Sequence, residues 1–232
     1  MIDKDILDDQ IHDVTMVCTL LTWSKHFRGG LILDVGASLG FFSKKILEYY
    51  PNSRVVAIEP SIINFGYLVE NVKGLNVLPI QGAVTNGENV IKFYENINPN
   101  QGTLFLGEYF SQMSDSIVDE YPVLGLDFQS LVKTLEPNLI KIDIEGYEFF
   151  LDYSNLPKSV NTIVMEVHMA DISAQGQILK GIIENDVEIY SNIVDNLKSQ
   201  GFEFVEMVGQ VFPWNGLWTG ESRTHLMCMS RE

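Results

Sequence analysis

The stretch from residue 31 to residue 50 constrains the fold of this chain more than any other. A short apolar run, 31–35, carries Asp34 near its end, a turn with Gly36 and Gly40 follows, and apolar residues then recur at helical spacing. This order predicts a strand, a tight turn and a helix. The glycines permit positive φ angles, and a helix that starts behind such a turn presents free N–H groups to a polar ligand.

The same alternation of apolar runs and helical patterns continues along the chain. Strands are predicted at 31–35, 54–59, 75–80, 138–143, 160–167, 202–208 and 224–230. Helices are predicted at 41–50, 61–72, 128–135, 146–153 and 186–200. Such alternation implies an α/β fold with a doubly wound, mostly parallel sheet. The link before the last strand is too short for a parallel crossover, so that strand is predicted to be antiparallel.

Length and composition support a single folded domain. The chain has 232 residues, of which 46% are hydrophobic, which suits one α/β domain with a full core. We therefore expect residues 31–232 to form one domain and residues 1–30 to form a leading helical segment. Further β-like runs lie within residues 88–127, on either side of a polar loop.

Charge and cysteine usage limit the classes of partner. The formal net charge is −16, and no cluster of Lys or Arg offers a surface for nucleic-acid phosphates. The two cysteines, Cys18 and Cys228, lack metal-ligand spacing, and free buried thiols in a reducing compartment are expected, with a structural disulfide as the alternative. No apolar run has the length of a membrane span, and the acidic amino terminus lacks a signal-peptide pattern. We expect a cytoplasmic protein that binds neither nucleic acid nor membrane.

The turn after the first strand favours one class of nucleoside cofactor. It reads Asp34-x-Gly36-x-Ser38-x-Gly40, whereas dinucleotide-binding turns read G-x-G-x-x-G. An acid at this point repels a pyrophosphate and attracts the ammonium group of S-adenosylmethionine, which has no phosphate. A second acid, Glu59, ends the next strand, where a carboxylate can accept both hydroxyls of a ribose. The alternative is that this turn binds no ligand, and the presence of Glu59 argues against that interpretation.

Several sequence blocks resemble the FkbM family of methyltransferases. The blocks lie at 34–43, 59–71, 82–84, 126–127 and 139–148, and the last reads Leu-Ile-Lys-Ile-Asp-Ile-Glu-Gly-Tyr-Glu. The resemblance implies a class I (Rossmann-like) methyltransferase fold and transfer of a methyl group from S-adenosylmethionine to a hydroxyl of a sugar or natural product. One departure is Ser38, where the family commonly has Asn, although a small hydroxyl can still serve the turn.

Acidic residues and a histidine follow two strands that are expected to be neighbours. Asp143 follows one strand, and Glu166 and His168 lie at the end of the next. Residues two apart in an extended segment share a face, so these side chains are predicted to converge near the transferred methyl group. Two roles fit. His168 is the general base for the acceptor hydroxyl, or Asp143, Glu166 and His168 hold a divalent cation such as Mg²⁺ or Mn²⁺. A histidine with a purely structural hydrogen bond is the alternative.

Other polar residues complete the predicted site. Gln81 and Ala83, just beyond the third strand, are expected near the adenine, although a simple loop role fits Gln81 equally well. Lys141 lies inside a strand and either pairs with an acid or points into the site. Glu148 is expected to cap the helix predicted at 146–153.

Three functional hypotheses follow. The first is an S-adenosylmethionine-dependent O-methyltransferase acting on a small hydroxylated molecule or saccharide. The second is a cofactor-binding module of the same fold without catalysis. The third is an NAD(P)-dependent oxidoreductase, which the glycine turn and the lack of a Tyr-x-x-x-Lys pair disfavour.

Overall fold

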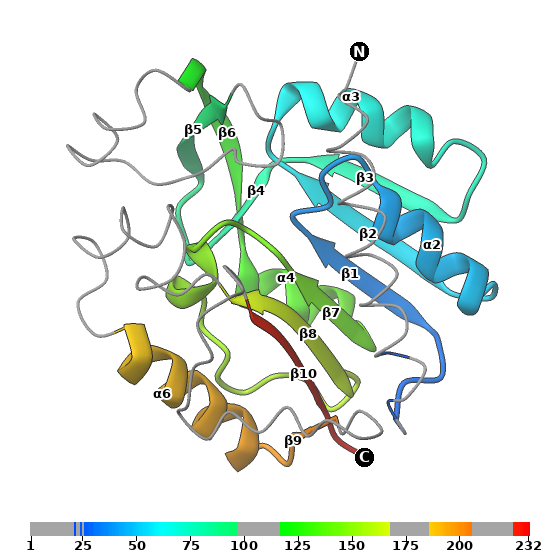
Figure 1. The fold of residues 1–232 in the computed structure, drawn as a ribbon, viewed down its shortest axis with the longest axis vertical. Coiled ribbons are helices and arrows are strands. Elements are labelled where there is room, and N and C mark those ends of the chain that lie inside the picture. Colours follow the sequence, from blue (N-terminus) through cyan, green and yellow to red (C-terminus); the bar gives the residue numbers. More distant parts are fainter. Residues whose placement is uncertain (1–20, 22–23, 25, 97–116, 168–185, 206–224) are drawn as a thin grey trace.

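A computed structural model describes residues 21, 24, 26–96, 117–167, 186–205 and 225–232. Its centre is a seven-stranded sheet in the order β3-β2-β1-β7-β8-β10-β9 (Figure 1). The strands of this sheet are β1 (Leu31–Val35), β2 (Arg54–Glu59), β3 (Val77–Gln81), β7 (Leu139–Ile142), β8 (Thr162–Val167), β9 (Glu203–Phe204) and β10 (His225–Ser230). β1, β2, β3, β7 and β8 are parallel, and β10 is antiparallel to both β8 and β9. The predicted doubly wound Rossmann-like α/β fold with an antiparallel last strand is therefore confirmed.

A second, smaller sheet lies beside the first. It has the order β4-β6-β5, and its strands are β4 (Ala83–Thr85), β5 (Val90–Asn96) and β6 (Ile117–Asp127). β5 and β6 form an antiparallel pair, whereas β4 runs parallel to β6. The β5–β6 pair, called the hairpin below, stands upright beside β4 in Figure 1. It corresponds to the β-like runs expected within residues 88–127.

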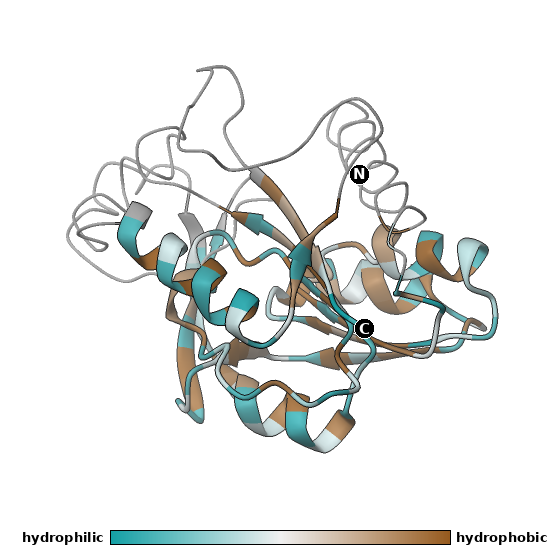
Figure 2. Ribbon diagram, turned by 90° about the horizontal axis from the view of Figure 1, so that it is seen from below, coloured by the Kyte–Doolittle hydropathy of each residue, from teal (hydrophilic) through white to brown (hydrophobic). Residues whose placement is uncertain are grey.

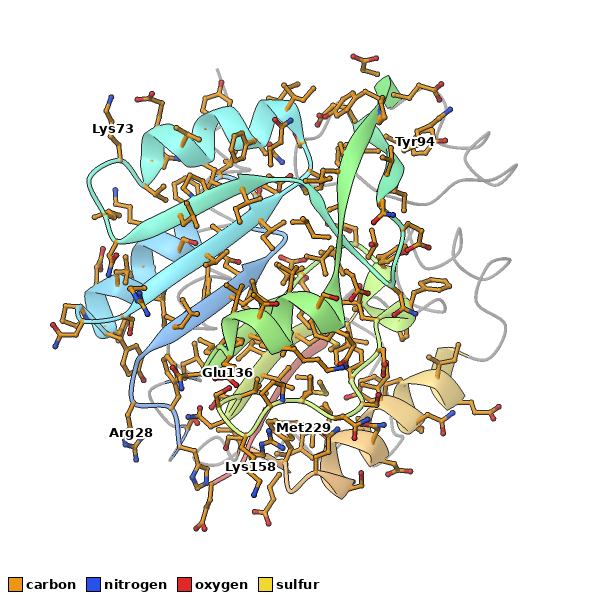
Figure 3. The ribbon with its side chains drawn as sticks, turned by 180° about the vertical axis from the view of Figure 1, so that it is seen from behind. Arg28, Lys73, Tyr94, Glu136, Lys158 and Met229 are labelled. Carbon is orange, nitrogen blue, oxygen red and sulfur yellow. The ribbon has the colours of Figure 1, made fainter. Side chains whose placement is uncertain are left out.

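Helices cover both faces of the large sheet. They are α2 (Phe41–Tyr49), α3 (Ile62–Asn71), α4 (Phe128–Leu135) and α6 (Asp186–Ser199), with one 3-10 turn, η4 (Tyr147–Phe150). α2 lies in front of the sheet in Figure 1, and α4 lies in front of it in Figure 3, which is the view from behind. These two helices therefore pack on opposite faces, as a doubly wound topology requires.

The strands bury both of their faces. In β1, Leu33 belongs to the apolar cluster that includes α4, and Ile32 belongs to the cluster that includes α2. Successive side chains of a strand point to opposite faces, so a strand covered on both sides must be apolar almost throughout. Figure 2 shows this as brown, hydrophobic segments running through the strands, while the helices around them carry much of the teal. A charged residue within these strands therefore requires a local partner.

Two predicted elements differ from the structure or lie outside the described residues. The helix expected at 146–153 is wrong, because only Tyr147–Phe150 form one 3-10 turn. The Tyr153 hydroxyl donates to the Glu148 carbonyl at 2.8 Å, and that carbonyl would accept a backbone N–H in a continuing helix. Of the strand expected at 202–208, β9 is observed, and 206–208 lie outside the described residues.

Most of the leading segment, 1–20, also lies outside the described residues, so the helix expected there stays a prediction. Within the part of the chain that the structure describes, no helix combines the length and apolar character needed to cross a bilayer.

Candidate functional site

The turn between β1 and α2 packs directly on the end of β7. Gly36 has a φ of 74°, and a Cβ added to it would lie 1.7 Å from the Asp143 carbonyl oxygen. The Gly36 and Ala37 N–H groups both donate to the Ile58 carbonyl at 3.0 Å, which ties the turn to the end of β2. Glycine is required at position 36 both by the backbone conformation and by the space.

The second glycine of the turn has a different neighbour. Gly40 has a φ of 83°, and a Cβ there would lie 2.6 Å from a side-chain carbon of Leu68 in α3. Between the glycines, Ser38 also adopts a left-handed conformation, with a φ of 48°. That conformation is uncommon outside glycine, asparagine and aspartate, so the turn is held in its shape by its surroundings.

Asp34 is fully buried beneath the turn. Its Oδ2 accepts a 2.6 Å hydrogen bond from the Ser43 hydroxyl of α2, and its Oδ1 lies 3.6 Å from Lys141 Nζ. Burial raises the pKa of Asp34, and the nearby ammonium and hydroxyl oppose that shift. Asp34 therefore holds the start of α2 against β1 and places an acid next to Lys141.

Lys141 resolves the choice that the sequence left open, because it pairs with acids. Its Nζ lies 3.3 Å from Asp143 Oδ2 and donates to the Gly36 carbonyl at 2.7 Å, in addition to its contact with Asp34. Burial alone lowers the pKa of Lys141, but the carboxylates of Asp143, Asp34 and Glu166 raise it above its ordinary value. A charged lysine thus joins β1, the glycine turn and the end of β7.

The strand register places five charged residues on one face of the sheet. Asp34 is opposite Lys141, and Lys141 is opposite Val164. On its other side, Asp34 is opposite Ala57, so these four residues form one row across the sheet. Two residues further along three of the strands the chain carries Glu59, Asp143 and Glu166. Because residues two apart in a strand share a face, these charges gather at the carboxyl edge of the parallel strands, where α/β proteins bind ligands.

Glu59 is held by two backbone donors. Its Oε2 accepts from the Ser38 N–H at 2.8 Å, and its Oε1 accepts from the Ser61 N–H at 2.9 Å. The side chain is buried, and this burial raises the pKa of Glu59 to about 7 despite the two donors. Since a carboxylate oxygen has two acceptor sites, each oxygen retains one for a further donor.

The residues expected near an adenine lie beside Glu59. Gln81 is opposite Glu59 in the β2–β3 register and is exposed, and Ala83 is buried at the start of β4. Between them, the Gly82 N–H donates to the Glu59 carbonyl at 3.1 Å. The β3–β4 connection therefore crosses the sheet edge next to the second acid of the predicted site.

These features are those of a known family. The sequence profile described as "Methyltransferase FkbM domain" matches residues 34–204, which include the end of β1, the glycine turn, Glu59 and β7. This chain belongs to the FkbM methyltransferase family. Members of this S-adenosylmethionine-dependent family have the Rossmann-like architecture described above, so the family confirms the class of enzyme and of cofactor expected from the sequence.

Similar proteins carry methyltransferase names. "Methyltransferase 1" of Beauveria bassiana (strain ARSEF 2860) is 23% identical over 201 residues, covering 84% of this chain and 72% of that protein. Among solved structures, magnesium protoporphyrin IX methyltransferase of Synechocystis PCC 6803 with bound S-adenosylmethionine is 11% identical, with a TM-score of 0.48 over 99% of this chain and 83% of the other. The methyltransferase domain of bacterial CtHen1-C is 9% identical, with a TM-score of 0.48 over 96% and 98% of the two chains.

The FkbM domain also contains a further buried acid, which the sequence does not mark. Glu95, in β5, accepts hydrogen bonds from the Ser61 hydroxyl and from the Tyr121 hydroxyl of β6. The only available signal was its inward position two residues after the buried Phe93. No sequence motif marks Glu95 or Tyr121.

Glu148 binds the backbone at the start of η4, although the helix that it was expected to cap does not form. Its Oε2 accepts from the Gly146 N–H at 2.8 Å, and the side chain is fully buried. Gly146 has a φ of 101°, and the preceding Glu145 has a φ of 53°. Glu148, which ends the block at 139–148, therefore helps the chain to turn sharply after β7.

The predicted catalytic residues are only partly within the described structure. Asp143 and Glu166 follow the paired residues Ile142 and Met165 of adjacent strands, as expected. His168 lies outside the described residues. Among the residues that are described, no three His, Cys, Asp or Glu side chains form a group suited to a metal ion. The cation placed between Asp34 and Asp143 is the Lys141 ammonium.

Proposed function

We propose that this FkbM-family protein is an O-methyltransferase that moves a methyl group from S-adenosylmethionine to a hydroxyl of a small molecule or saccharide. The observation that carries the proposal is the pair of backbone N–H groups, of Ser38 and Ser61, that fix the Glu59 carboxylate at the end of β2. A carboxylate fixed in this way, with an acceptor site left on each oxygen, suits the two hydroxyls of a ribose.

The remaining residues of the site fit the other parts of the cofactor. The turn from Gly36 to Gly40 would hold the methionine portion through backbone groups, and Gln81 and Ala83 would flank the adenine. Asp34 is fully buried, so we assign it a role through its charge and its hold on α2 rather than through contact. None of the residues of the turn, 36–40, is basic, and the Lys141 ammonium beside it is paired with Asp34 and Asp143, which favours a cofactor without phosphates.

The transfer requires one proton acceptor. The bound cofactor supplies an electrophilic methyl group on a sulfonium. As the oxygen–carbon bond forms and the sulfur–carbon bond breaks, the acceptor hydroxyl must lose its proton. We assign this proton to His168, with Glu166 and Asp143 nearby to stabilise the imidazolium that forms. Positioning of the oxygen in line with the sulfonium supplies the rest of the acceleration.

A divalent cation held by Asp143, Glu166 and His168 is the second candidate for activating the hydroxyl. The position of Lys141 favours the histidine base, because its ammonium lies 3.3 Å from Asp143 and already balances that charge. A second cation at the same carboxylate would be repelled at this distance. The two roles differ in their response to a chelator and to added Mg²⁺.

We expect the acceptor to be a small hydroxylated molecule rather than nucleic acid or a membrane lipid, and we expect it in the cytoplasm. A net charge of −16 repels the phosphates of nucleic acids and of anionic membranes. The resemblance to the FkbM family implies a hydroxyl of a sugar or natural product as the acceptor, which supports the same class of substrate.

Calorimetry with S-adenosylmethionine, S-adenosylhomocysteine and NAD⁺ tests the cofactor. We expect micromolar binding of the first two and none of the third, and binding of NAD⁺ alone would overturn the proposal. A screen of glycans and hydroxylated metabolites, with S-adenosylhomocysteine release as the readout, then tests transfer. Cofactor binding without turnover on any acceptor would favour a non-catalytic module of the same fold.

A further inference from the structure

Glu95 is a buried carboxylate outside the blocks that mark the family. It lies in β5 of the hairpin, and only 2% of its surface is exposed. β5 belongs to the small sheet rather than to the sheet that carries Asp34, Glu59 and Lys141. A buried acid is costly unless donors surround it, so its partners indicate why it is there.

Hydroxyl groups from two different elements satisfy Glu95. The Ser61 hydroxyl donates to both carboxylate oxygens at 2.9 Å, and the Tyr121 hydroxyl donates to Oε2. Tyr121 is on β6, and Ser61 precedes α3 in the loop that follows Glu59. Glu95 therefore joins the hairpin to the segment between β2 and α3.

The two hydroxyls also organise the start of α3. Ser61 is the N-cap residue, and its hydroxyl accepts from the Asn64 N–H at 3.0 Å. The Tyr121 hydroxyl accepts from the Ile62 N–H at 2.9 Å. These bonds satisfy N–H groups that a helix leaves open in its first turn. The N-terminus of α3 is thus fixed from the hairpin side.

Ser61 forms the bridge between the two acids. Its hydroxyl donates to Glu95, while its own N–H donates to Glu59 at 2.9 Å. Only one rotatable bond separates the Ser61 hydroxyl from its backbone, so the bonds of this hydroxyl to Glu95 and from the Asn64 N–H restrain the N–H that holds Glu59. The orientation of the Glu59 carboxylate consequently depends on a residue in the other sheet.

We propose that Glu95 is a positioning residue for the cofactor: it fixes Ser61, so that the Ser61 N–H holds Glu59 in the orientation that accepts the ribose hydroxyls. The inference rests on the proposed function of Glu59. It also gives the β5–β6 hairpin a role in cofactor affinity, although no residue of this hairpin belongs to the glycine turn or to the strand ends of the large sheet.

The pH dependence of cofactor affinity is a readout that would not change if Glu95 only stabilised the fold. Besides the Ser38 and Ser61 N–H groups, two charged residues act on Glu59: Lys141, which lowers its pKa, and Glu95, which raises it. Ribose hydroxyls that donate to Glu59 favour its ionised form, so cofactor affinity should rise as pH increases through about 7. Loss of the Glu95 charge should move this midpoint to lower pH.

The test is calorimetric titration of the full chain with S-adenosylhomocysteine between pH 5.5 and 8.5. We compare the parent protein with Glu95→Gln and with Glu120→Gln, which removes one exposed charge of the same hairpin from its pair with Lys92. For Glu95→Gln we expect about tenfold weaker binding at pH 8, the effect of one charge-assisted hydrogen bond, and a midpoint at lower pH. Glu120→Gln should leave both unchanged. Ionisation of the ligand cancels in these comparisons.

Tyr121→Phe keeps the Glu95 charge and provides a second test if Glu95→Gln unfolds. It removes one donor to Glu95, and we expect several-fold weaker binding in a protein that is folded by circular dichroism. Parent-like affinity and midpoint in folded Glu95→Gln, or parent-like affinity in folded Tyr121→Phe, would overturn the positioning role. If the parent protein itself binds no S-adenosylhomocysteine, the proposed function fails and the inference fails with it.

Discussion

The ammonium of Lys141 lies 3.6 Å from a carboxylate oxygen of Asp34, and the two side chains are 11% and 0% exposed. Both residues sit within parallel strands that are otherwise apolar, and they are directly opposite each other in the β1–β7 register. Lys141 also reaches Asp143 and the Gly36 carbonyl, so one charge stabilises a buried acid, the glycine turn and the end of β7.

Removal of this lysine should strongly destabilise the fold. Lys141→Met leaves Asp34 buried without a counter-ion, and the expected loss in the free energy of unfolding is about 3–5 kcal/mol. Lys92→Met is the control, because Lys92 forms an exposed pair with Glu120 and its loss should change the free energy of unfolding little. Urea denaturation measures both. Equal effects of the two substitutions would mean that the buried pair contributes no more than an exposed one.

The glycine turn allows the steric clash of an added Cβ to be separated from the cost of a positive φ angle. Gly36 and Gly74 have similar φ angles, 74° and 79°, but only Gly36 has atoms within 4 Å of the position of an added Cβ. Gly74→Ala should cost about 1 kcal/mol, the price of the left-handed conformation alone. Gly36→Ala should cost clearly more and should abolish binding of S-adenosylhomocysteine. Retained binding by Gly36→Ala would show that the turn is not part of the cofactor site.

Glu59 makes stability depend on pH. Its pKa is about 7 in the folded protein against an ordinary 4.5, so the folded state holds an extra proton between these values. The free energy of unfolding should therefore be highest below this window and fall as pH rises through it, by about 3 kcal/mol in total.

The test is denaturation at pH values from 5 to 8. Glu59→Gln removes the ionisation, so its stability should vary less with pH, and the difference between the two proteins isolates Glu59 from Asp34. Because the Gln amide would face one of the two N–H donors, this variant is also expected to be less stable at every pH. Identical slopes for the two proteins would contradict the assignment.

His168→Ala should lower the rate of methyl transfer by about 10²-fold or more, the range for loss of a general base. Affinity for S-adenosylmethionine should stay at the parent value, because the proposed cofactor residues are elsewhere. His26→Ala is the control for loss of a histidine and should retain the parent rate. A rate that a chelator abolishes and Mg²⁺ restores would instead assign His168 to a cation.

The local elements of this fold follow from the sequence, and the contacts across it do not. The glycine turn and helix α2 begin where the pattern predicts, since glycine spacing and apolar period are local signals. The helix expected at 146–153 was wrong because the Tyr153 side chain takes a carbonyl that the helix needs. Lys141 was ambiguous for a related reason: its partner Asp34 is brought near by strand pairing and not by proximity in the chain.

The candidate site also contains some residues that the sequence identifies and others that only the structure identifies. Glu59 is marked by its place at a strand end, whereas Glu95 and Tyr121 are marked by nothing until β5 and β6 pair and face α3. A buried network of this kind depends on the relative placement of two sheets. Periodicity can indicate only that Glu95 points inward.

The hydrogen bonds of Ser61 limit which amino-acid replacements its partners can tolerate in related sequences. Its hydroxyl must donate to Glu95 and accept from the helix N-terminus, and the Tyr121 hydroxyl must do both as well. A chain that loses the acid at 95 leaves the buried Ser61 hydroxyl and the partly buried Tyr121 hydroxyl without this acceptor, so a single replacement at 61, 95 or 121 should be destabilising. Relatives should therefore either keep all three of these positions or exchange them together for an apolar set.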